Sequence, residues 1–203
     1  MKKELYIFRH GETDWNKENR CMGWTDVPLN DNGRAQAGRL SKTLQGTGLE
    51  IIYSSPLSRT FETAKIVAEP NNTEIMQNDA LKERNNGIIE GSIPRIDFPD
   101  FDKKMDDPDF APPGGESTNQ LRSRVLAAID DIIKNSDKKI IGISTSNGVA
   151  MIILKKFAAQ EPPRTNMPNS EYYRLDWDGE NLKMNETPQW LDAAYKYAAS
   201  NVK

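Results

Sequence analysis

The sequence contains one histidine, His10, and one cysteine, Cys21. A zinc site needs about four ligands drawn from His, Cys, Asp and Glu, so this scarcity argues against a zinc hydrolase. A lone cysteine also excludes an internal disulfide bond. A serine triad would have to use His10 as its base, and the G-x-S-x-G motif that marks many such enzymes is missing. We therefore expect no bound metal.

Long hydrophobic runs are missing as well. Near the N-terminus, two lysines are followed only by the short apolar run 5–8, which is too short for the core of a signal peptide. No stretch approaches the roughly 18 apolar residues of a membrane-spanning helix. The formal net charge of -3 gives no sign of nucleic-acid binding, and Lys134, Lys138 and Lys139 fit a solvated face at a helix end. We expect a cytoplasmic protein with neither a membrane nor a nucleic-acid partner, and its oligomeric state is left open.

The composition is that of an ordinary soluble domain. The chain has 203 residues, of which 36% are hydrophobic and 28% are charged, which suits one well-formed core and is short for two. We therefore expect a single domain over 1–203. Residues 86–115 are rich in Pro, Gly and Asp and lack a sustained period, so they are predicted to form a long excursion or lid. The tail after residue 190 is weakly helical and is expected to be flexible.

Strand-like and helix-like segments alternate along the chain. Short apolar runs predict strands at 4–8, 50–54, 73–77, 139–143, 172–177 and 181–185, the last two as a hairpin. Periodicity and capping residues predict helices over 31–45, from Pro56 through Val67, over 116–134 and over 149–159. This alternation with short connections predicts an α/β fold in which helices cover a largely parallel central sheet.

Three of the predicted strands end in polar clusters. Arg9-His10-Gly11 follows the first strand, Ser54-Ser55 follows the second, and the polar run 144–148 follows the strand at 139–143. In open α/β sheets, ligands bind beyond the carboxyl ends of the strands. We therefore expect the three clusters to converge on one site.

His10 and two arginines give this site a chemistry suited to phosphate esters. Neutral imidazole is a competent nucleophile at phosphorus near neutral pH, although a histidine without such neighbours would be read as an ordinary surface residue. Arg9 offers the forked donors that suit phosphate. Arg59 falls in the first turn of a predicted helix, where free N–H groups and the helix dipole also favour an anion. Together these residues predict a phosphoryl-binding pocket.

Cleavage of a phosphoester also needs a proton for the leaving alcohol and a base for water. One carboxyl group can serve both purposes, provided that burial keeps it protonated beside the cations. The residues alone leave Glu83, Glu90 and Glu12 as candidates.

These stretches resemble the motifs of the histidine phosphatase superfamily, also called phosphoglycerate mutase-like proteins. RHGETDWN at 9–16 is similar to the family signature, and SSPLSRTFETA at 54–64 is similar to its second-arginine motif. GWTDVPLNDNGRAQA (23–37), LKERNNGIIEG (81–91) and GGES (114–117) agree in order and spacing. The resemblance spans residues 4–185 and implies a three-layer α/β/α sandwich, which matches the alternation of elements.

The resemblance also implies roles for individual residues. His10 would accept the phosphoryl group, and Glu83 would act as general acid and then as base for water. Arg9, Arg59 and Asn16 would bind the phosphoryl group. Family members need neither a metal nor an organic cofactor for phosphatase activity, so no cofactor is expected.

One position departs from the family pattern. Family members carry a second pocket histidine in a strand-end motif such as V-S-H-G-G-V, and the matching position here holds Ser146. Removing one such donor costs about 3–4 kcal/mol, or roughly 100- to 1000-fold in rate. Ser146 and Asn147 can each still donate a hydrogen bond to the phosphoryl group. We therefore expect a slow enzyme.

Arg84 and Gly23 are further candidates for contact with the substrate. In the mutases and several sugar-phosphate phosphatases of the family, a pair similar to Glu83-Arg84 lies at the pocket mouth, and its arginine contacts a second anionic group of the substrate. A solvated surface arginine is the alternative interpretation. Gly23 follows Cys21 and Met22 on a loop expected near the pocket, although ordinary packing would also explain that loop.

Three functions are compatible with this sequence. We favour a phosphomonoester hydrolase that acts on a small phosphorylated metabolite through a phosphohistidine intermediate. The first alternative is a cofactor-dependent phosphoglycerate mutase, but such mutases are longer and more basic in the region matching 86–115, where this chain has only Arg95, Lys103 and Lys104. The second alternative, motivated by Ser146, is a non-catalytic protein that binds a phosphorylated ligand.

Overall fold

The computed structural model describes residues 1–158, 160–163, 165–184 and 186–200. One sheet has the strand order β3-β2-β4-β1-β5-β6. Its strands are β1 (Lys3–Arg9), β2 (Ile51–Ser54), β3 (Glu74–Gln77), β4 (Ile140–Thr145), β5 (Tyr172–Trp177) and β6 (Leu182–Lys183). The first four strands are parallel to one another, and β5 runs antiparallel to both β1 and β6. The predicted α/β fold with a largely parallel sheet is confirmed.

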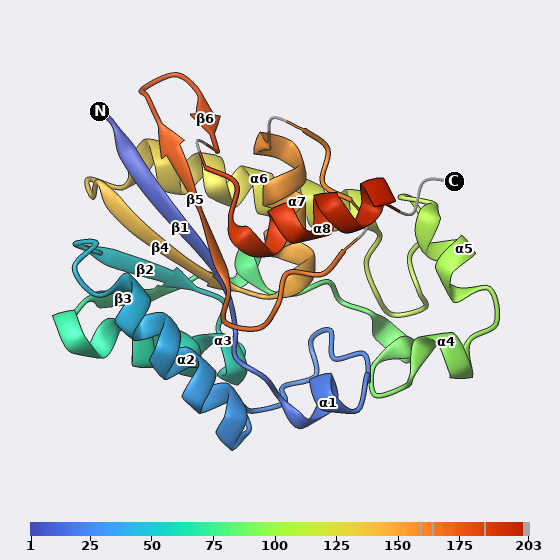
Figure 1. Ribbon diagram of the computed structural model, residues 1–203. Helices are drawn as coiled ribbons and strands as arrows, with labels where there is room; N and C mark the ends of the chain where they lie inside the picture. The colour runs from blue at the N-terminus through green and yellow to red at the C-terminus, as the bar shows by residue number, and fades with distance from the viewer. Residues whose placement is uncertain (159, 164, 185, 201–203) are drawn as a thin grey trace.

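Helices cover both faces of this sheet (Figure 1). They are α1 (Asp14–Lys17), α2 (Asp31–Leu44), α3 (Ser58–Ala68), α4 (Pro94–Asp97), α5 (Phe101–Asp106), α6 (Thr118–Asn135), α7 (Asn147–Phe157) and α8 (Gln189–Ser200). Helices α2 and α3 lie on one face, and α6, α7 and α8 lie on the other. No helix within the described ranges combines the length and the apolar character needed to cross a membrane.

The alternating side chains of β1 contribute to both cores. Leu5 and Ile7 pack in the apolar cluster that includes α6 and α7, whereas Tyr6 and Phe8 pack in the cluster that includes α2 and α3. All four side chains are buried, because a central parallel strand is covered on both faces. This explains why the strand reads as a continuous apolar run, and it confirms the three-layer α/β/α arrangement.

Three helices begin at positions that differ from the sequence predictions. Helix α6 begins at Thr118 and not at residue 116, because Ser117 is its N-cap. Helix α3 begins at Ser58 and not at Pro56, because the backbone of Leu57 is still extended. Helix α7 begins at Asn147 and not at Val149, since the extended backbone of Ser146 occupies the N-cap position. Gly148, expected in a loop, therefore lies in the first helical turn. The predicted end of this helix at 159 falls outside the described residues.

The excursion at 86–115 is not wholly irregular. It contains the short helices α4 and α5, and the first of these begins with Pro94, a residue favoured at a first helical position. Both helices are too short for a hydrophobic period to be visible in the sequence. Figure 1 shows α1 together with α4 and α5 beyond the carboxyl ends of β1 and β4, at one edge of the molecule.

The C-terminal tail forms a continuous helix, α8. Leu191 is fully buried in the core beside α6 and α7, and Trp190 Nε1 donates a hydrogen bond of 3.3 Å to the carbonyl oxygen of Tyr172. Tyr195 Oη donates a further bond of 3.0 Å to the carbonyl oxygen of Gln160. These contacts hold α8 against the sheet and α7.

Candidate active site

The carboxyl ends of β1, β2 and β4 bring the three polar clusters together. The backbone N–H of His10 donates to the carbonyl oxygen of Thr145 at 3.0 Å, and the N–H of Ser55 donates to that of Ser144 at 3.1 Å. Parallel neighbouring strands end at the same edge of a sheet, so their terminal residues are adjacent. The site therefore begins where the sheet ends.

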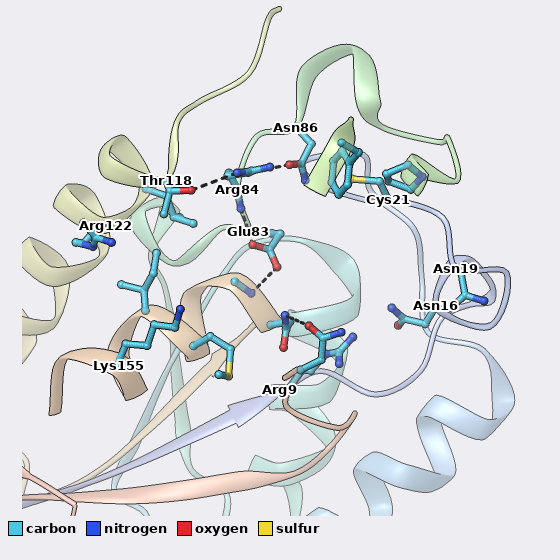
Figure 2. Close-up of a pocket in the computed structure, with 18 of the residues that line it drawn as sticks. Arg9, Asn16, Asn19, Cys21, Glu83, Arg84, Asn86, Thr118, Arg122 and Lys155 are labelled. Atoms are coloured by element: carbon cyan, nitrogen blue, oxygen red, sulfur yellow. Dashed lines mark hydrogen bonds between the residues drawn. The ribbon is translucent and has the colours of Figure 1, made fainter. Parts of the chain in front are cut away.

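A cavity of about 1070 Å³ opens at this edge, and Figure 2 shows many of its lining residues. Five residues expected at the site contribute to its lining, namely Arg9, Asn16, Glu83, Arg84 and Asn147. Four other expected residues are buried and do not contribute to the lining, namely His10, Gly23, Arg59 and Ser146. Within the described ranges, no three His, Cys, Asp or Glu side chains are grouped so that they could hold a metal ion.

The His10 ring is held in one tautomer by its own neighbour. Its Nδ1 lies 2.6 Å from the carbonyl oxygen of Gly11, which can only accept a hydrogen bond. Nδ1 must therefore carry the proton, and Nε2 keeps its lone pair. Burial, followed by the positive charges of Arg59 and Arg9, holds the pKa of His10 well below its ordinary value of 6.5. The imidazole is thus neutral and nucleophilic near neutral pH.

Arg59 and Arg9 are fixed by backbone carbonyl groups rather than by carboxylates. Arg59 donates to the carbonyl oxygens of Thr25 at 3.0 Å and Gly23 at 2.7 Å, and Arg9 donates to that of Met167. Burial lowers the pKa of Arg9 to about 10 and also lowers the pKa of Arg59. Carbonyl oxygens orient the two guanidinium groups without neutralising them, so the site keeps a positive field.

Four buried donors in this part of the molecule have no hydrogen-bond partner among the described residues. They are Nε of Arg9, Nε of Arg59, Oγ of Ser146 and Oγ of Ser170, whose backbone N–H donates to the carbonyl oxygen of His10. Most buried polar groups in proteins are paired, and an unpaired one calls for an explanation. Two cations and a hydroxyl group that converge beside a neutral imidazole have the chemistry of a site for a phosphoryl anion.

The amide of Asn16 is oriented by its neighbours. Its Oδ1 accepts hydrogen bonds from N and Oγ1 of Thr13, both at 3.2 Å, and from Nδ2 of Asn169 at 3.3 Å. These donors identify the oxygen, so the NH₂ group of Asn16 is left to face the cavity. A fixed amide donor of this kind suits a phosphoryl oxygen.

The structure separates the three acid candidates by their surroundings. Glu90 accepts hydrogen bonds from the backbone N–H groups of Trp24 and Thr25, both at 2.8 Å, and so fixes the loop that holds Arg59. Glu12 accepts a bond from Asn30 Nδ2 at 3.0 Å at the start of α2. Neither glutamate contributes to the cavity lining, whereas Glu83 does.

Glu83 is positioned by two backbone donors. Its Oε2 accepts a hydrogen bond from the N–H of Gly148 at 2.9 Å, and its Oε1 accepts one from the N–H of Arg84 at 2.7 Å. Its charge also raises the pKa of both Arg9 and Arg59 against the effect of burial, which places it within their electrostatic reach. Among the three candidates, this geometry favours Glu83 as the acid.

Asn147 and Arg84 have their side chains engaged by neighbouring groups. Asn147 Oδ1 accepts from the N–H of Met167 at 2.9 Å, and its Nδ2 donates to Asn166 Oδ1 at 2.9 Å. Arg84 is nearly buried, and its Nε donates to Asn86 Oδ1 at 2.9 Å. The alternative interpretation of Arg84 as a solvated surface residue is therefore wrong.

Asn169 is a site residue that the sequence analysis missed. Its Nδ2 donates to the backbone oxygen of His10 at 3.0 Å and to Asn16 Oδ1 at 3.3 Å, so Asn169 links His10 to the side chain of Asn16. One sequence signal could have identified it. It lies three residues before the start of an antiparallel strand, β5, and that start lies beside the carboxyl end of β1.

A methyl group at Gly148 is expected to displace the carboxylate of Glu83. The Cβ of an alanine there would collide with Glu83 Oε1, the mobile end of a flexible side chain, so the carboxylate must move. Misplacing a catalytic group by about 1 Å can cost about 100-fold in rate. We expect Gly148→Ala to lower kcat for an alkyl phosphate by about 10- to 100-fold, measured as phosphate release.

Gly38→Ala is the matched control for this substitution. Gly38 also lies within a helix, α2, and has no atom within 4 Å of the position that a Cβ would take. Its replacement should leave kcat unchanged and stabilise the fold by about 0.5–1 kcal/mol. An unchanged kcat in folded Gly148→Ala would show that the position of the Glu83 carboxylate does not limit the reaction.

The free energy of unfolding is expected to decrease as the pH falls below about 6.5, the ordinary pKa of histidine. The folded chain holds the pKa of its single histidine well below this value, so the unfolded chain binds more protons in that range. The contribution is complete above about pH 6.5 and is lost below it, with a slope of at most about 1.4 kcal/mol per pH unit. Urea unfolding of the wild type and of His10→Gln measures this slope, which the variant should lack between about pH 5.5 and 6.5. An equal slope in both proteins would contradict the conclusion that the folded chain lowers the pKa of His10.

Comparison with known proteins agrees with this geometry. The family model of the histidine phosphatase superfamily (branch 1) matches residues 5–187. Phosphoglycerate mutase-like protein 4 of Arabidopsis thaliana is 36% identical over 156 residues, which cover 72% of this chain and 67% of that protein. The uncharacterized phosphatase PhoE of Bacillus subtilis (strain 168) is 30% identical over 156 residues, which cover 77% of this chain and 78% of PhoE.

A solved structure shows the same arrangement. Bacillus stearothermophilus YhfR superposes with a TM-score of 0.82 and 32% sequence identity, over 90% of this chain and 95% of YhfR. The family match covers nearly all of the chain, and its relatives include both phosphatases and phosphoglycerate mutase-like proteins. The chain is therefore an enzyme of the histidine phosphatase superfamily.

Proposed function

We propose that this enzyme hydrolyses a small phosphomonoester and that His10 is the residue it phosphorylates. The observation that carries the proposal is a buried imidazole whose Nε2 keeps its lone pair, close to two buried arginines that form no ion pair among the described residues. A nucleophile of this kind, next to fixed cationic donors, is suited to phosphoryl transfer, which depends mainly on positioning and electrostatics.

In the first step, the Nε2 lone pair of His10 attacks phosphorus and an N–P bond forms. The ester P–O bond breaks, and the carboxyl group of Glu83 gives its proton to the leaving alcohol oxygen. Arg9, Arg59 and the amide of Asn16 donate to the phosphoryl oxygens and stabilise the charge that they carry in the transition state. The products of this step are the free alcohol and a phosphohistidine.

In the second step, water attacks the phosphorus of the phosphohistidine. Glu83, now a carboxylate, accepts a proton from that water, the N–P bond breaks, and its electron pair returns to Nε2 of His10. Inorganic phosphate leaves, and the protonated Glu83 is ready for the next cycle. Every proton in this scheme moves between the chain, the substrate and water, so the proposal includes no metal and no organic cofactor.

We expect both steps to be slow because of Ser146. A hydroxyl group is a short donor, whereas a histidine at that position would extend an N–H donor further toward the phosphoryl group. The unpartnered Oγ of Ser146 can supply one hydrogen bond, and Asn147 on the cavity lining can supply another. These donors would retain part of the stabilisation.

The charges around the excursion at 86–115 favour hydrolysis over mutase activity. In the mutases of this family, added basic residues in the region that matches 86–115 help to retain a bisphosphorylated primer between turnovers. Here Arg95 is paired with Asp102 at 3.0 Å, and Lys103 and Lys104 do not contribute to the cavity lining. Some relatives are nevertheless named as phosphoglycerate mutases or probable phosphoglycerate mutases, so a mutase is the second candidate.

A panel of phosphomonoesters tests the proposal. The purified chain is assayed for phosphate release from p-nitrophenyl phosphate, phosphoserine and sugar phosphates, and for isomerisation of 3-phosphoglycerate with and without a bisphosphoglycerate primer. Release of phosphate supports a hydrolase, whereas isomerisation that depends on the primer supports the mutase. If neither reaction occurs but inorganic phosphate raises Tm, the chain is a binding protein and the proposal fails.

A further inference from the structure

The cavity is much larger than a phosphoryl group requires. Its volume of about 1070 Å³ slightly exceeds the range of about 300–1,000 Å³ that is usual for sites of drug-sized ligands. Beyond Arg9 and Asn16 it extends along a wall formed by α6 and α7, which contributes apolar groups such as Leu126 and Met151. A bound phosphomonoester would therefore direct its alcohol portion toward this wall.

The same wall carries cations that no carboxylate neutralises. Arg122 of α6 and Lys155 and Lys156 of α7 line the cavity. Arg122 donates to Asn119 Oδ1 at 2.7 Å, and none of the three cations forms an ion pair within the part of the chain that the structure describes. Among the described residues of the lining, the acidic side chains are Glu83 and Glu161, in a chain of net charge -3. The wall is thus locally positive on a molecule that is negative overall.

Two other cations on the cavity lining are paired with acidic side chains. Arg20 at the rim pairs with Glu18 at 2.9 Å, and Arg95 pairs with Asp102 at 3.0 Å. The cations on the wall formed by α6 and α7 therefore differ from Arg20 and Arg95, each of which forms an ion pair with an acidic side chain.

Arg84 is also less available than the wall cations. Its guanidinium donates to Asn86 Oδ1 at 2.9 Å and to Thr118 Oγ1 at 3.4 Å, and it contacts Met105 Sδ at 3.0 Å. Most of its directions are therefore occupied, and it is nearly buried. The exposed side chains of Arg122 and Lys155 keep donors that can reach a ligand.

Helix dipoles explain only part of this arrangement. Lys155 and Lys156 lie in the last turn of α7, where a positive charge stabilises any helix. Arg122 lies near the start of α6, where the dipole gives a positive charge no such advantage. Figure 2 shows Arg122 and Lys155 on one side of the cavity and Asn16 and Asn19 on the other, so the two cations face the same space from neighbouring helices.

We propose that the substrate is an elongated phosphomonoester with a second anionic group at its far end, and that Arg122 and Lys155 bind that group. The proposal rests on the proposed function, because the reacting phosphate must lie at His10 for its far end to reach the wall. A phosphate or a carboxylate fits two facing cations, and the apolar groups between the two ends suit a carbon linker. Lys156 adds to the same field.

Matched substrates separate the contribution of the distal charge. Hexyl phosphate, hexanediol bisphosphate and phosphooxyhexanoate share a carbon chain and differ only in the far group, which is a methyl, a phosphate or a carboxylate. Diol bisphosphates from propanediol to octanediol vary the distance between the reacting phosphate and the distal group. The assay measures kcat and KM for each with the wild type, with Arg122→Gln/Lys155→Gln, and with the control Arg39→Gln/Lys134→Gln. Both control residues are exposed and lie outside the cavity lining.

We expect the wild type to prefer the best doubly anionic substrate to hexyl phosphate by about 10- to 100-fold in kcat/KM, the range of one or two charge-assisted hydrogen bonds. The Arg122→Gln/Lys155→Gln protein should lose this preference, mainly through a higher KM, while its kcat/KM for hexyl phosphate stays unchanged. The control protein should keep the preference. The compound that gives the larger increase in kcat/KM over hexyl phosphate identifies the distal group, which is a phosphate if it is a diol bisphosphate and a carboxylate if it is phosphooxyhexanoate.

Two results would overturn the inference. One is an equal kcat/KM for singly and doubly anionic substrates of every length, and the other is a preference that survives in Arg122→Gln/Lys155→Gln. If hexyl phosphate is hydrolysed in either case, the proposed function stands without this inference. If nothing is hydrolysed, the proposed function fails. The inference is then tested by calorimetric binding of the same compounds. Equal affinities for hexyl phosphate and hexanediol bisphosphate would contradict it.

Discussion

Replacing His10 with alanine is expected to abolish turnover and the phosphoenzyme together. The lone pair on Nε2 is the proposed nucleophile, and no other histidine in the chain can substitute for it. Loss of a covalent nucleophile typically lowers kcat by about 10⁴-fold or more. Phosphate release gives kcat, and rapid acid quench with a radiolabelled phosphoester, followed by analysis of the acid-labile phosphoprotein, detects the intermediate.

The buried position of His10 makes a second variant necessary. Alanine leaves a cavity beside Arg9 and Arg59, so a loss of activity could come from a local collapse of the site. Glutamine fills more of the space but is not a nucleophile of comparable strength. We expect both variants to be inactive and to remain folded by circular dichroism, and we expect His10→Gln to keep its affinity for inorganic phosphate. Full activity in either variant would contradict the phosphohistidine mechanism.

The parts of the site that lie close in sequence were predictable. The strand at 4–8 ends in Arg9-His10, and parallel pairing with β4 follows from the alternation of elements, so the meeting of the strand ends could be predicted before any coordinates. The side on which the His10 ring is protonated was not predictable, although it depends on the very next residue, Gly11. A motif gives the position of a residue but not the side-chain angles that set its hydrogen bonds.

Contacts between distant segments were beyond the reach of the sequence. Glu83 is oriented by the N–H of Gly148, and Arg59 is held by carbonyl oxygens of the loop at 23–25. Each of these bonds joins a side chain to the backbone of another segment, and any residue type supplies the same N–H or C=O group. Periodicity and motifs therefore could not separate Glu83 from Glu90, whereas the resemblance to the family could.

Replacing Ser146 with histidine is expected to raise kcat by about 100- to 1000-fold. Ser146 occupies the N-cap position of α7, yet its side chain makes no capping bond, and its Oγ is buried without a partner among the described residues. The hydroxyl group therefore contributes little to the fold, and its removal costs little. A longer side chain with an N–H donor at this position would add a hydrogen bond to the phosphoryl group during transfer, and the negative charge of that group strengthens the bond. The assay is phosphate release from the best substrate of the panel.

Two alanine variants make this prediction specific. Ser146→Ala removes an unpaired hydroxyl group, so it should lower kcat by about 10-fold while leaving Tm nearly unchanged. Ser144→Ala is the matched control on the same strand end, because Ser144 Oγ donates to the carbonyl oxygen of Thr60 at 2.8 Å. That variant should lose about 1 kcal/mol of folding free energy and keep its kcat. If Ser146→His is folded and no faster than the wild type, then a missing donor is not what limits this enzyme, and the slow step must lie in the placement of Glu83 or in product release.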